Sequence, residues 1–251
     1  MSAGGPAPSE VLPVDAWRAL AGRRIYFGHQ SVGYNILEGV TSMIQERGLR
    51  GLVLRDDGDP AALQTPGLIH SKLGSNGDAF SKIQAFSNLM HAGAGRLADA
   101  ALFKLCYVDI ELHADPGAIF DRYTSTMNAL AQAFPRVRFL HCTSPLTAIP
   151  GGLKNAVKKA IGREIWGYEQ NPRRGEFNAK MRERYAGEGT LFDIARLECT
   201  RPDASLEGFD WQGTRHEALF PGYSNDGGHL GPAGQRALGE AFLDFLARAT
   251  A

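Results

Sequence analysis

The stretch RRIYFGHQSVGYNILEGV, residues 23–40, begins with a short apolar run, passes through a glycine and a polar triplet, and continues with helical spacing. Residues 24–27 have the length and composition of a buried strand, and 32–47 place their apolar residues on one helical face. A strand that turns tightly into a helix is the first part of a crossover connection. Ser31 stands at the bend, where it can cap the helix or present its hydroxyl to a ligand.

Short apolar runs alternate with longer segments of helical period along the rest of the chain. This alternation is typical of parallel strands joined by helical crossovers, with helices on both faces of the sheet. It predicts an α/β fold, a three-layer α/β/α sandwich around a mainly parallel five-stranded sheet. Strands are expected at 24–27, 51–55, 100–108, 136–142 and 189–194. Helices are expected at 32–47, 79–91, 116–133, as a pair within 154–185, and at 232–248.

The length and composition favour one globular domain. A chain of 251 residues, 43% hydrophobic and 22% charged, is long enough to bury one good core. We assign 21–251 to a single domain and 1–20, with its Gly, Pro, Ser and Ala, to a flexible lead-in. Lys plus Arg equal Asp plus Glu at 27 each, so there is no basic excess of the kind that binds nucleic acid. The most basic segment, 151–163, is expected to be the solvated face of an amphipathic helix.

The sequence leaves the compartment and the oligomeric state open. No run approaches the roughly 18 apolar residues that a membrane span needs. The first residues, MSAGGPAPSE, lack the apolar region of a signal peptide, and both a cytoplasmic and an exported protein fit the chain. Cys106, Cys142 and Cys199 are too few for a disulfide framework and show no CxxC spacing. We expect buried free thiols, with one disulfide open to an exported protein.

The loops that follow the strands carry the candidate functional residues, because ligands of a parallel sheet bind where its strands end. Ser31 follows the first strand. The sequence SNGD, residues 75–78, comes after the second strand and at the start of a helical pattern. Gly77 permits a close backbone approach there, and Asp78 can cap the helix. A plain turn with a cap is the simpler interpretation of this segment.

Asp226 and His229 stand three residues apart in a glycine-rich turn directly before the last predicted helix. Such a turn can bring the carboxylate against the near ring nitrogen and leave the far nitrogen free as a general base. The alternative is an Asn-Asp-Gly-Gly turn with an exposed histidine. The turn taken alone leaves both open.

A third strand running into CYVDIELHADP, residues 106–116, suggests a different chemistry. If the chain stays extended, Asp109, Glu111 and His113 project to one side and could bind a metal ion. The alternative is the polar end of a strand followed by the cap of the next helix. His141 lies within an apolar run, and we expect a core histidine with satisfied hydrogen bonds.

Together these blocks resemble the SGNH (GDSL-like) hydrolase family, whose fold is flavodoxin-like. In that family a nucleophilic serine follows the first strand in a GDS motif, a glycine and an asparagine after the next two strands bind the oxyanion, and a DxxH motif precedes the last helix. Here FGHQS stands at the first block, SNGD at the glycine block, and DGGHL, followed by GPAG, at the DxxH block. The resemblance covers 23–248, and the last motif is the specific one.

Two departures from the family pattern bear on the site. The step from Gly28 to Ser31 is one residue longer than in GDS, so a gapless alignment puts Gln30 at the nucleophile. We assign Ser31, because glutamine cannot attack and the residues after Ser31 continue as a helix. The third block, LCYVD, has Val108 where the asparagine is expected, and valine donates no hydrogen bond. Losing one oxyanion donor costs about 10²-fold to 10³-fold in rate, and Asn76 is our hypothesis for the substitute.

The mechanism that the resemblance implies is acyl transfer from an ester. His229, oriented by Asp226, would take the proton of Ser31, and the N–H groups of Ser31 and Gly77, with Asn76, would hold the oxyanion. No metal or organic cofactor is needed. The expected substrate is a carboxylic ester of a small molecule or glycan, an acetyl ester above all. Aromatic residues expected near the rim, which could stack on sugar rings, are Trp166, Tyr168, Trp211 and Tyr223.

Other interpretations of the same residues stay open. The altered first and third blocks are compatible with a weakly active or inactive module of the same fold that binds a glycan or another ligand. An acyltransferase would use the same serine, histidine and oxyanion donors. A metal-dependent hydrolase would use Asp109, Glu111 and His113, with His229 as a further ligand.

Overall fold

The computed structural model describes residues 13–48, 50–151 and 166–251. Its central sheet has five parallel strands in the order β2-β3-β1-β4-β5. These are β1 (Arg24–His29), β2 (Leu54–Asp56), β3 (Gly67–Lys72), β4 (Ala100–Phe103) and β5 (Arg138–Phe139). Just beyond β5, β6 (His141–Cys142) pairs in parallel with β7 (Leu191–Phe192). The expected fold class, a mainly parallel five-stranded sheet within three layers, is confirmed.

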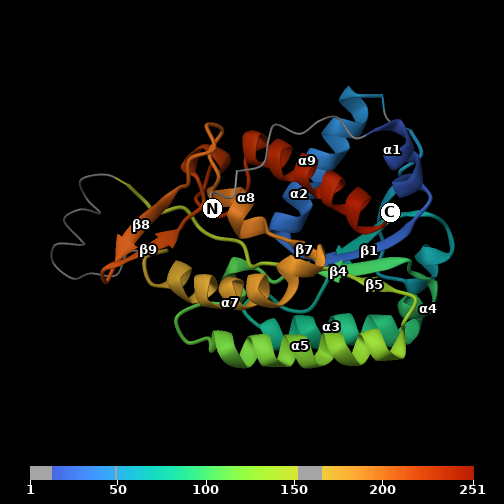
Figure 1. Cartoon of the computed structure of the whole chain (residues 1–251), viewed down its shortest axis with the longest axis horizontal. Helices are drawn as coiled ribbons and strands as arrows, with labels where there is room; N and C mark the ends of the chain where they lie inside the picture. The colour runs from blue at the N-terminus through green and yellow to red at the C-terminus, as the bar shows by residue number, and fades with distance from the viewer. Residues whose placement is uncertain (1–12, 49, 152–165) are drawn as a thin grey trace.

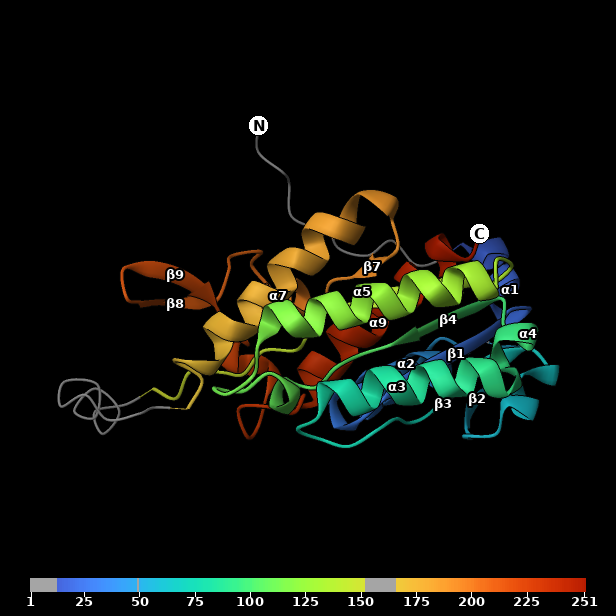
Figure 2. The ribbon, with the colours of Figure 1, turned by 90° about the horizontal axis from the view of Figure 1, so that it is seen from below.

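Helices cover both faces of this sheet, as Figure 1 and Figure 2 show. One layer holds α1 (Val14–Ala21), α2 (Ser31–Glu46) and α9 (Pro232–Ala249), and the other holds α3 (Ala79–Leu89), α5 (Pro116–Ala133) and α7 (Gln170–Tyr185). Two short helices are α4 (Gly95–Leu97) and α8 (Ile194–Cys199). Single turns or irregular helices are Pro60–Gln64, Met90–Ala94, Tyr107–Asp109, Ala186–Glu188 and Pro221–Tyr223.

Alternate residues of the strands are buried in two separate hydrophobic cores, one on each face of the sheet. Ile25 and Phe27 of β1 pack with α2 and α9, whereas Tyr26 packs with α3 and α5. This is the two-faced burial that a parallel sheet between helical layers requires. The contact between α2 and α9 is close, because a Cβ on Gly39 would lie 1.8 Å from the Gln235 carbonyl oxygen. Any larger residue than glycine at position 39 would therefore push apart the two helices that flank the site.

Several expected elements match the structure closely. The expected helices 32–47, 116–133 and 232–248 correspond to α2, α5 and α9, and 79–91 corresponds to α3 with its irregular extension. Of the pair expected within 154–185, the second is α7, and 152–165 lie outside the described residues. The basic segment 151–163 falls almost wholly in that part of the chain.

The expected strands are partly wrong. The segment 67–72, expected to be part of a loop, forms β3 beside β1, and 189–194 supplies only β7, which pairs with β6 outside the five-stranded sheet. The third strand ends at Phe103 instead of at residue 108. Strand β3 lacks a clear sequence signal because its Leu-Ile pair is followed by His-Ser-Lys, and the buried His70 and Ser71 bond to other buried polar groups.

The N-terminal boundary and the long connection 196–225 also need revision. Helix α1 lies within the stretch assigned to a flexible lead-in, and its Trp17 and Leu20 are buried against the core, so the ordered fold begins before residue 21. The connection contains a hairpin of β8 (Gly208–Trp211) and β9 (Thr214–Glu217). Figure 1 shows that this hairpin projects at the end of the sheet where α2 begins.

The described part of the chain agrees with two further expectations. Cys106, Cys142 and Cys199 are buried free thiols. No helix among the described residues is long and apolar enough to cross a membrane.

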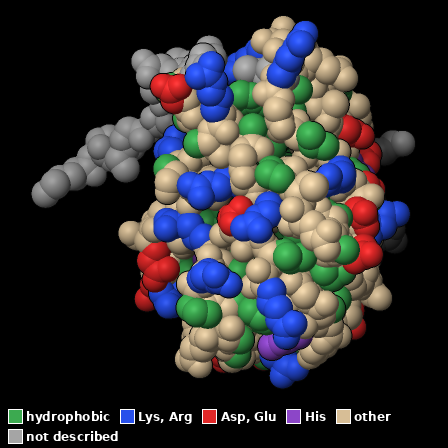
Figure 3. Space-filling model, turned by 90° about the vertical axis from the view of Figure 1, so that its right-hand side faces the viewer, with side chains coloured by type: hydrophobic (Ala, Val, Ile, Leu, Met, Phe, Trp, Pro, Cys, Tyr) green, Lys and Arg blue, Asp and Glu red, His purple; other side chains and the backbone are tan. Residues whose placement is uncertain are grey.

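At the end of the molecule near α1 and α4, Lys and Arg side chains are mixed with acidic and hydrophobic ones (Figure 3).

Candidate functional site

Ser31 is the first residue of α2 and does not cap it. The residue in the cap position is Gln30, whose side chain instead donates from Nε2 to the carbonyl oxygens of Leu73 and Gly74, at 3.0 Å each. Among the described residues, the Ser31 hydroxyl and the Ser31 N–H have no hydrogen-bond partner. The hydroxyl is half-buried at the first turn of a helix, where the backbone N–H groups and the helix dipole favour a negative charge.

The turn before α9 brings Asp226 and His229 together. Asp226 Oδ2 lies 2.6 Å from His229 Nδ1, and Asp226 Oδ1 accepts from the N–H groups of His229, at 2.7 Å, and of Gly228, at 2.9 Å. Burial opposes ionisation of Asp226, but these hydrogen bonds outweigh it and hold the pKa of the carboxyl well below its usual range. A charged Asp226 makes Nδ1 the protonated ring nitrogen, which leaves the Nε2 lone pair available as a base.

Hydrogen bonds attach this turn to α2 near Ser31. The Leu230 N–H donates to Asn35 Oδ1 at 3.1 Å. Gln235 Nε2, from α9, donates both to the Leu230 carbonyl at 3.0 Å and to Glu38 Oε2 of α2 at 2.7 Å. Asn35 lies four residues after Ser31, and side chains spaced by four in a helix have Cβ atoms about 5–6 Å apart on one face. The turn that carries His229 is therefore hydrogen-bonded to α2 one helical turn after Ser31.

Tyr107 packs beside His229. The two ring centroids are 5.9 Å apart in an edge-on arrangement, and a Cβ on Gly228 would lie 2.8 Å from the Tyr107 hydroxyl. Only glycine fits at 228 without moving this ring. Arg174 fixes Tyr107 from the other side, since its Nε donates to the Tyr107 carbonyl at 2.9 Å and its guanidinium carbon lies 5.6 Å from the ring centroid. Burial, and then the Asp226 carboxylate, raise the pKa of Tyr107.

In the SNGD loop, Asp78 has its expected capping role, the Gly77 N–H is not free for an oxyanion, and the role of Asn76 stays a prediction. Asp78 caps α3, as expected, and accepts from the Ser81 N–H at 2.9 Å. The Gly77 N–H donates to Asp109 Oδ1 at 2.9 Å, so it is already occupied and not free to hold an oxyanion. Asn76 is exposed, and its Oδ1 accepts from Lys82 Nζ at 3.1 Å. This contact leaves the two N–H donors of the Asn76 amide for another partner.

The carboxylate that occupies Gly77 belongs to a buried ion pair. Lys82 Nζ lies 2.6 Å and 2.7 Å from the two oxygens of Asp109, and both side chains are buried. Asp109 also accepts from the Cys106 N–H at 2.6 Å. Its four contacts tie the Gly77 loop, α3 and the segment after β4 into one unit.

The metal hypothesis for Asp109, Glu111 and His113 is wrong for this chain. The chain is not extended here, because residues 107–109 form a single 3₁₀ turn, and two-residue alternation does not apply. Asp109 is paired with Lys82, and Glu111 Oε1 lies 2.8 Å from Arg174 Nη2. Within the described ranges, no group of three or more His, Cys, Asp or Glu side chains could hold a metal ion. Val108 is half-buried after β4.

A buried polar cluster beside Ser31 was missed by sequence analysis. His29 Nε2 lies 3.1 Å from His70 Nδ1, and His29 Nδ1 lies 2.9 Å from the Gln30 carbonyl oxygen. Because a carbonyl accepts only, His29 carries its proton on Nδ1 and receives one from His70. Tyr34 packs edge-on against His29 and donates to Asp56 at 2.7 Å. The cluster anchors the first turn of α2 to β2 and β3. Residues 67–72, GLIHSK, give no alternating pattern from which it could have been predicted.

His141 and the four aromatic residues are also placed. His141 is a buried core residue that hydrogen-bonds the Tyr123 hydroxyl at 2.9 Å, as expected. Trp166 lies near Tyr107, with centroids 6.0 Å apart, and Tyr168 packs on Trp211 at 5.4 Å. Tyr223 is buried against Phe220 and does not face a rim.

Comparison with known proteins identifies the fold. No protein-family model matches the chain, and no curated protein sequence matches it. A solved structure from Parabacteroides merdae ATCC 43184, named as a GDSL-like lipase, is 13% identical with a TM-score of 0.53, and the match covers 90% of this chain and 94% of that one. This likeness, together with the sheet and its helices, shows an SGNH/GDSL hydrolase-like fold.

Two further solved structures are similar at lower scores. The periplasmic domain of a lipopolysaccharide acetyltransferase from Salmonella ser. Paratyphi A is 13% identical, with a TM-score of 0.48 over 88% of this chain and 82% of that one. An acetyl esterase, solved as a mutant with an acetate ion, is 15% identical, with a TM-score of 0.44 over 88% of this chain and 96% of that one. Solved structures this dissimilar in sequence show the fold and not the activity.

Proposed function

We propose that the protein is a serine esterase that hydrolyses carboxylic esters, acetyl esters above all, through Ser31, His229 and Asp226. The observation that carries the proposal is the Asp226–His229 pair, with its 2.6 Å contact to Nδ1, hydrogen-bonded through the next residue to the helix that begins with Ser31. The Ser31 hydroxyl has no partner among the described residues and stands at a helix N-terminus, and nucleophilic acyl transfer needs such a serine next to an oriented imidazole, the role proposed for His229.

The proposed reaction has two halves. In the first, Ser31 Oγ bonds to the ester carbonyl carbon as its proton passes to His229 Nε2, and the alcohol leaves with that proton. In the second, water gives a proton to His229 Nε2 as its oxygen bonds to the acyl carbon; the bond from that carbon to Ser31 Oγ then breaks, Oγ takes the proton back from His229, and the carboxylic acid leaves. Asp226 stays ionised and stabilises the imidazolium in both halves.

The oxyanion of each half would be held by the Ser31 N–H and the Asn76 amide. The Ser31 N–H is an unpaired helix N-terminal donor among the described residues, and the positive end of the α2 dipole adds to its effect. Asn76 stands two residues after Gly74, to which Gln30 is bonded, and Lys82 orients its amide. Gly77 is not included, because its N–H is bonded to Asp109.

Hydrolysis of 4-nitrophenyl acetate by the wild type, Ser31→Ala and His229→Ala tests this function. Each substitution should lower kcat by about 10³-fold or more, because nucleophile and base act as one unit. Circular dichroism should show an unchanged fold in both variants, since neither side chain is part of the core. Equal rates in all three proteins would refute the esterase and leave a binding module with this fold.

A further inference from the structure

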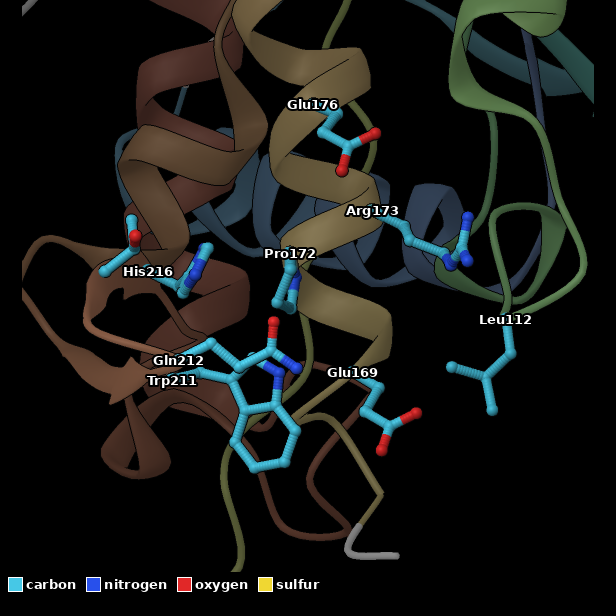
Figure 4. A pocket seen from close by; sticks show the side chains of 9 residues that line it. Leu112, Glu169, Pro172, Arg173, Glu176, Trp211, Gln212 and His216 are labelled. Atoms are coloured by element: carbon cyan, nitrogen blue, oxygen red, sulfur yellow. The ribbon is translucent and has the colours of Figure 1, made fainter.

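A groove outside the Ser31 site lies between α7 and the β8–β9 hairpin. It has a volume of about 480 Å³, within the range of about 300–1,000 Å³ that holds small ligands. Figure 4 shows Trp211, Gln212 and His216 beside Pro172 on one side of α7, and Glu169, Arg173 and Glu176 turned to the side on which Leu112 lies. Its lining residues on α7 and just before it are Glu169, Pro172, Arg173 and Glu176, and on the hairpin are Trp211, Gln212, Thr214 and His216.

The groove combines one flat apolar surface with many hydrogen-bonding groups. Trp211 is half-buried, because its indole packs on Tyr168 with the ring centroids 5.4 Å apart. Gln212, Thr214 and His216 can each donate and accept, and Arg173 keeps donors beyond the one bonded to the Ala114 carbonyl at 3.1 Å. A ligand that fits has an apolar face and hydroxyl groups around its edge, which is the description of a sugar ring.

The charges restrict the class of sugar. Glu169 and Glu176 form no ion pair among the described residues, and Arg173 is the one cation in the lining. Glu176 stands seven positions after Glu169, the residue before α7, which corresponds to about 10 Å along the helix axis. Two linked rings would span that distance, and their hydroxyl or amino groups could donate to the carboxylates at both ends. A polyanionic chain would be repelled by the same carboxylates.

The hairpin turn carries strain at a groove residue. Gln212 has φ of 47° and Gly213 has φ of 78°, so both central positions of the turn are left-handed. Asn, Asp and Gly are the residues that favour this turn, whereas a glutamine there is strained. Gln212 lines the groove beside Trp211, and strain kept at such a position is typical of a residue that contacts a ligand.

The groove is connected to the proposed esterase site. Arg173 lines the groove, and Arg174, the next residue, hydrogen-bonds Tyr107, whose ring lies 5.9 Å from that of His229. Leu112, a further lining residue, belongs to the segment that follows Tyr107. The helix that lines the groove is therefore also the helix that holds the Tyr107 ring beside His229.

We propose that this groove binds a short neutral or amino-bearing oligosaccharide, the alcohol part of the ester that Ser31 attacks. The proposal rests on the proposed function only for the ester; binding of the sugar by the groove is separate from hydrolysis. Trp211 supplies the stacking surface, and Glu169 and Glu176 accept from the sugar at the two ends.

Binding to the Ser31→Ala protein tests the groove without hydrolysis. Tetramers of N-acetylglucosamine, glucosamine, glucose and xylose are the probes, with tetragalacturonate as the polyanion, and titration calorimetry is the readout. At least one neutral or amino probe should bind saturably and tetragalacturonate should not. Trp211→Ala should weaken binding about tenfold or more, whereas Trp211→Phe should retain most of it. Phe80→Ala, which removes an exposed aromatic ring from α3, is the matched control.

The two proposals fail in different ways. Wild-type protein that binds a probe but does not hydrolyse 4-nitrophenyl acetate would overturn the esterase and keep the groove. Protein that hydrolyses 4-nitrophenyl acetate but binds no neutral or amino probe at millimolar concentration would overturn the groove and keep the esterase. Binding that Trp211→Ala and Phe80→Ala leave equally unchanged would also overturn the groove, because the ligand would then sit elsewhere.

Discussion

Asn35 Oδ1 accepts a hydrogen bond from the Leu230 N–H at 3.1 Å, and this contact joins the helix that begins with Ser31 to the turn that carries His229. Asn35→Ala removes it and leaves the Leu230 N–H without its partner. Because one neutral hydrogen bond contributes about 0.5–1.5 kcal/mol, kcat for 4-nitrophenyl acetate should fall by about two- to twelvefold. Ser42→Ala, on the exposed side of α2, should leave the rate unchanged and is the control. A rate as high as that of the control would mean that Asn35 does not position His229.

Asn76 is the proposed side-chain donor to the oxyanion, and two substitutions separate this role from its contact with Lys82. Asn76→Ala should lower kcat by about 10²-fold to 10³-fold with little change in KM. Asn76→Asp keeps an oxygen for Lys82 Nζ but has no N–H, so it should lose as much activity. Wild-type activity in Asn76→Asp would show that the oxyanion is held without this residue.

The buried pair of Lys82 and Asp109 should dominate the stability of this end of the sheet. Lys82→Met leaves a buried carboxylate without its counter-ion and should lower the free energy of unfolding by about 3–5 kcal/mol. In Lys82→Met/Asp109→Asn the charge is gone, but the single amide oxygen can accept from only one of the Gly77 and Cys106 N–H groups, which bond different oxygens of Asp109, so only part of the stability should return. Urea unfolding of the two variants measures this difference. If the double variant were no more stable than Lys82→Met, the loss would not come from the unpaired charge.

Two buried histidines should make the fold sensitive to mild acid. Burial lowers the pKa of His29 and of His141 to about 3, against about 6.5 in an unfolded chain. Between those values each of these two histidines binds more protons in the unfolded chain than in the folded protein, so its contribution to stability must fall as the pH is lowered through this window. Each histidine should contribute a slope of up to about 1.4 kcal/mol per pH unit.

Urea unfolding of the wild type and His141→Gln between pH 6.5 and 5 measures this slope. The glutamine keeps a hydrogen-bonding group for the Tyr123 hydroxyl but does not titrate. The free energy of unfolding of His141→Gln should change less steeply with pH than that of the wild type, by about 1 kcal/mol per pH unit. Equal slopes for the two proteins would mean that His141 binds as many protons in the folded protein as in the unfolded chain.

The parts of the fold that the sequence predicted are those in which local signals agree. Helix α5 has the predicted bounds, because Asp115 caps it by accepting from the Gly117 and Ala118 N–H groups and Pro116 fits its first turn. Strand β3 has no such signal. Its buried polar residues are acceptable only because Tyr26 and His29, more than 40 positions earlier, hydrogen-bond them at 2.8 Å and 3.1 Å.

In the candidate site, too, the features that depend on local spacing were predictable and those that depend on distant residues were not. The Asp226–His229 pair depends on a three-residue spacing inside one turn and was predictable. The use of the Gly77 N–H depends on Asp109, 32 positions later, and no pattern around Gly77 shows it. The pairing of Glu111 with Arg174, at a separation of 63, likewise removed a metal site that the local spacing allowed.

The most direct test of the account is to locate the adduct of an activated phosphonate ester by mass spectrometry of digested protein. If Ser31 is the nucleophile and His229 takes its proton, the wild type should carry one adduct, on the peptide that contains Ser31. Ser31→Ala should carry none, and His229→Ala should be labelled much more slowly. An adduct on a different residue, or no adduct while 4-nitrophenyl acetate is hydrolysed, would contradict the assignment of Ser31 as the nucleophile.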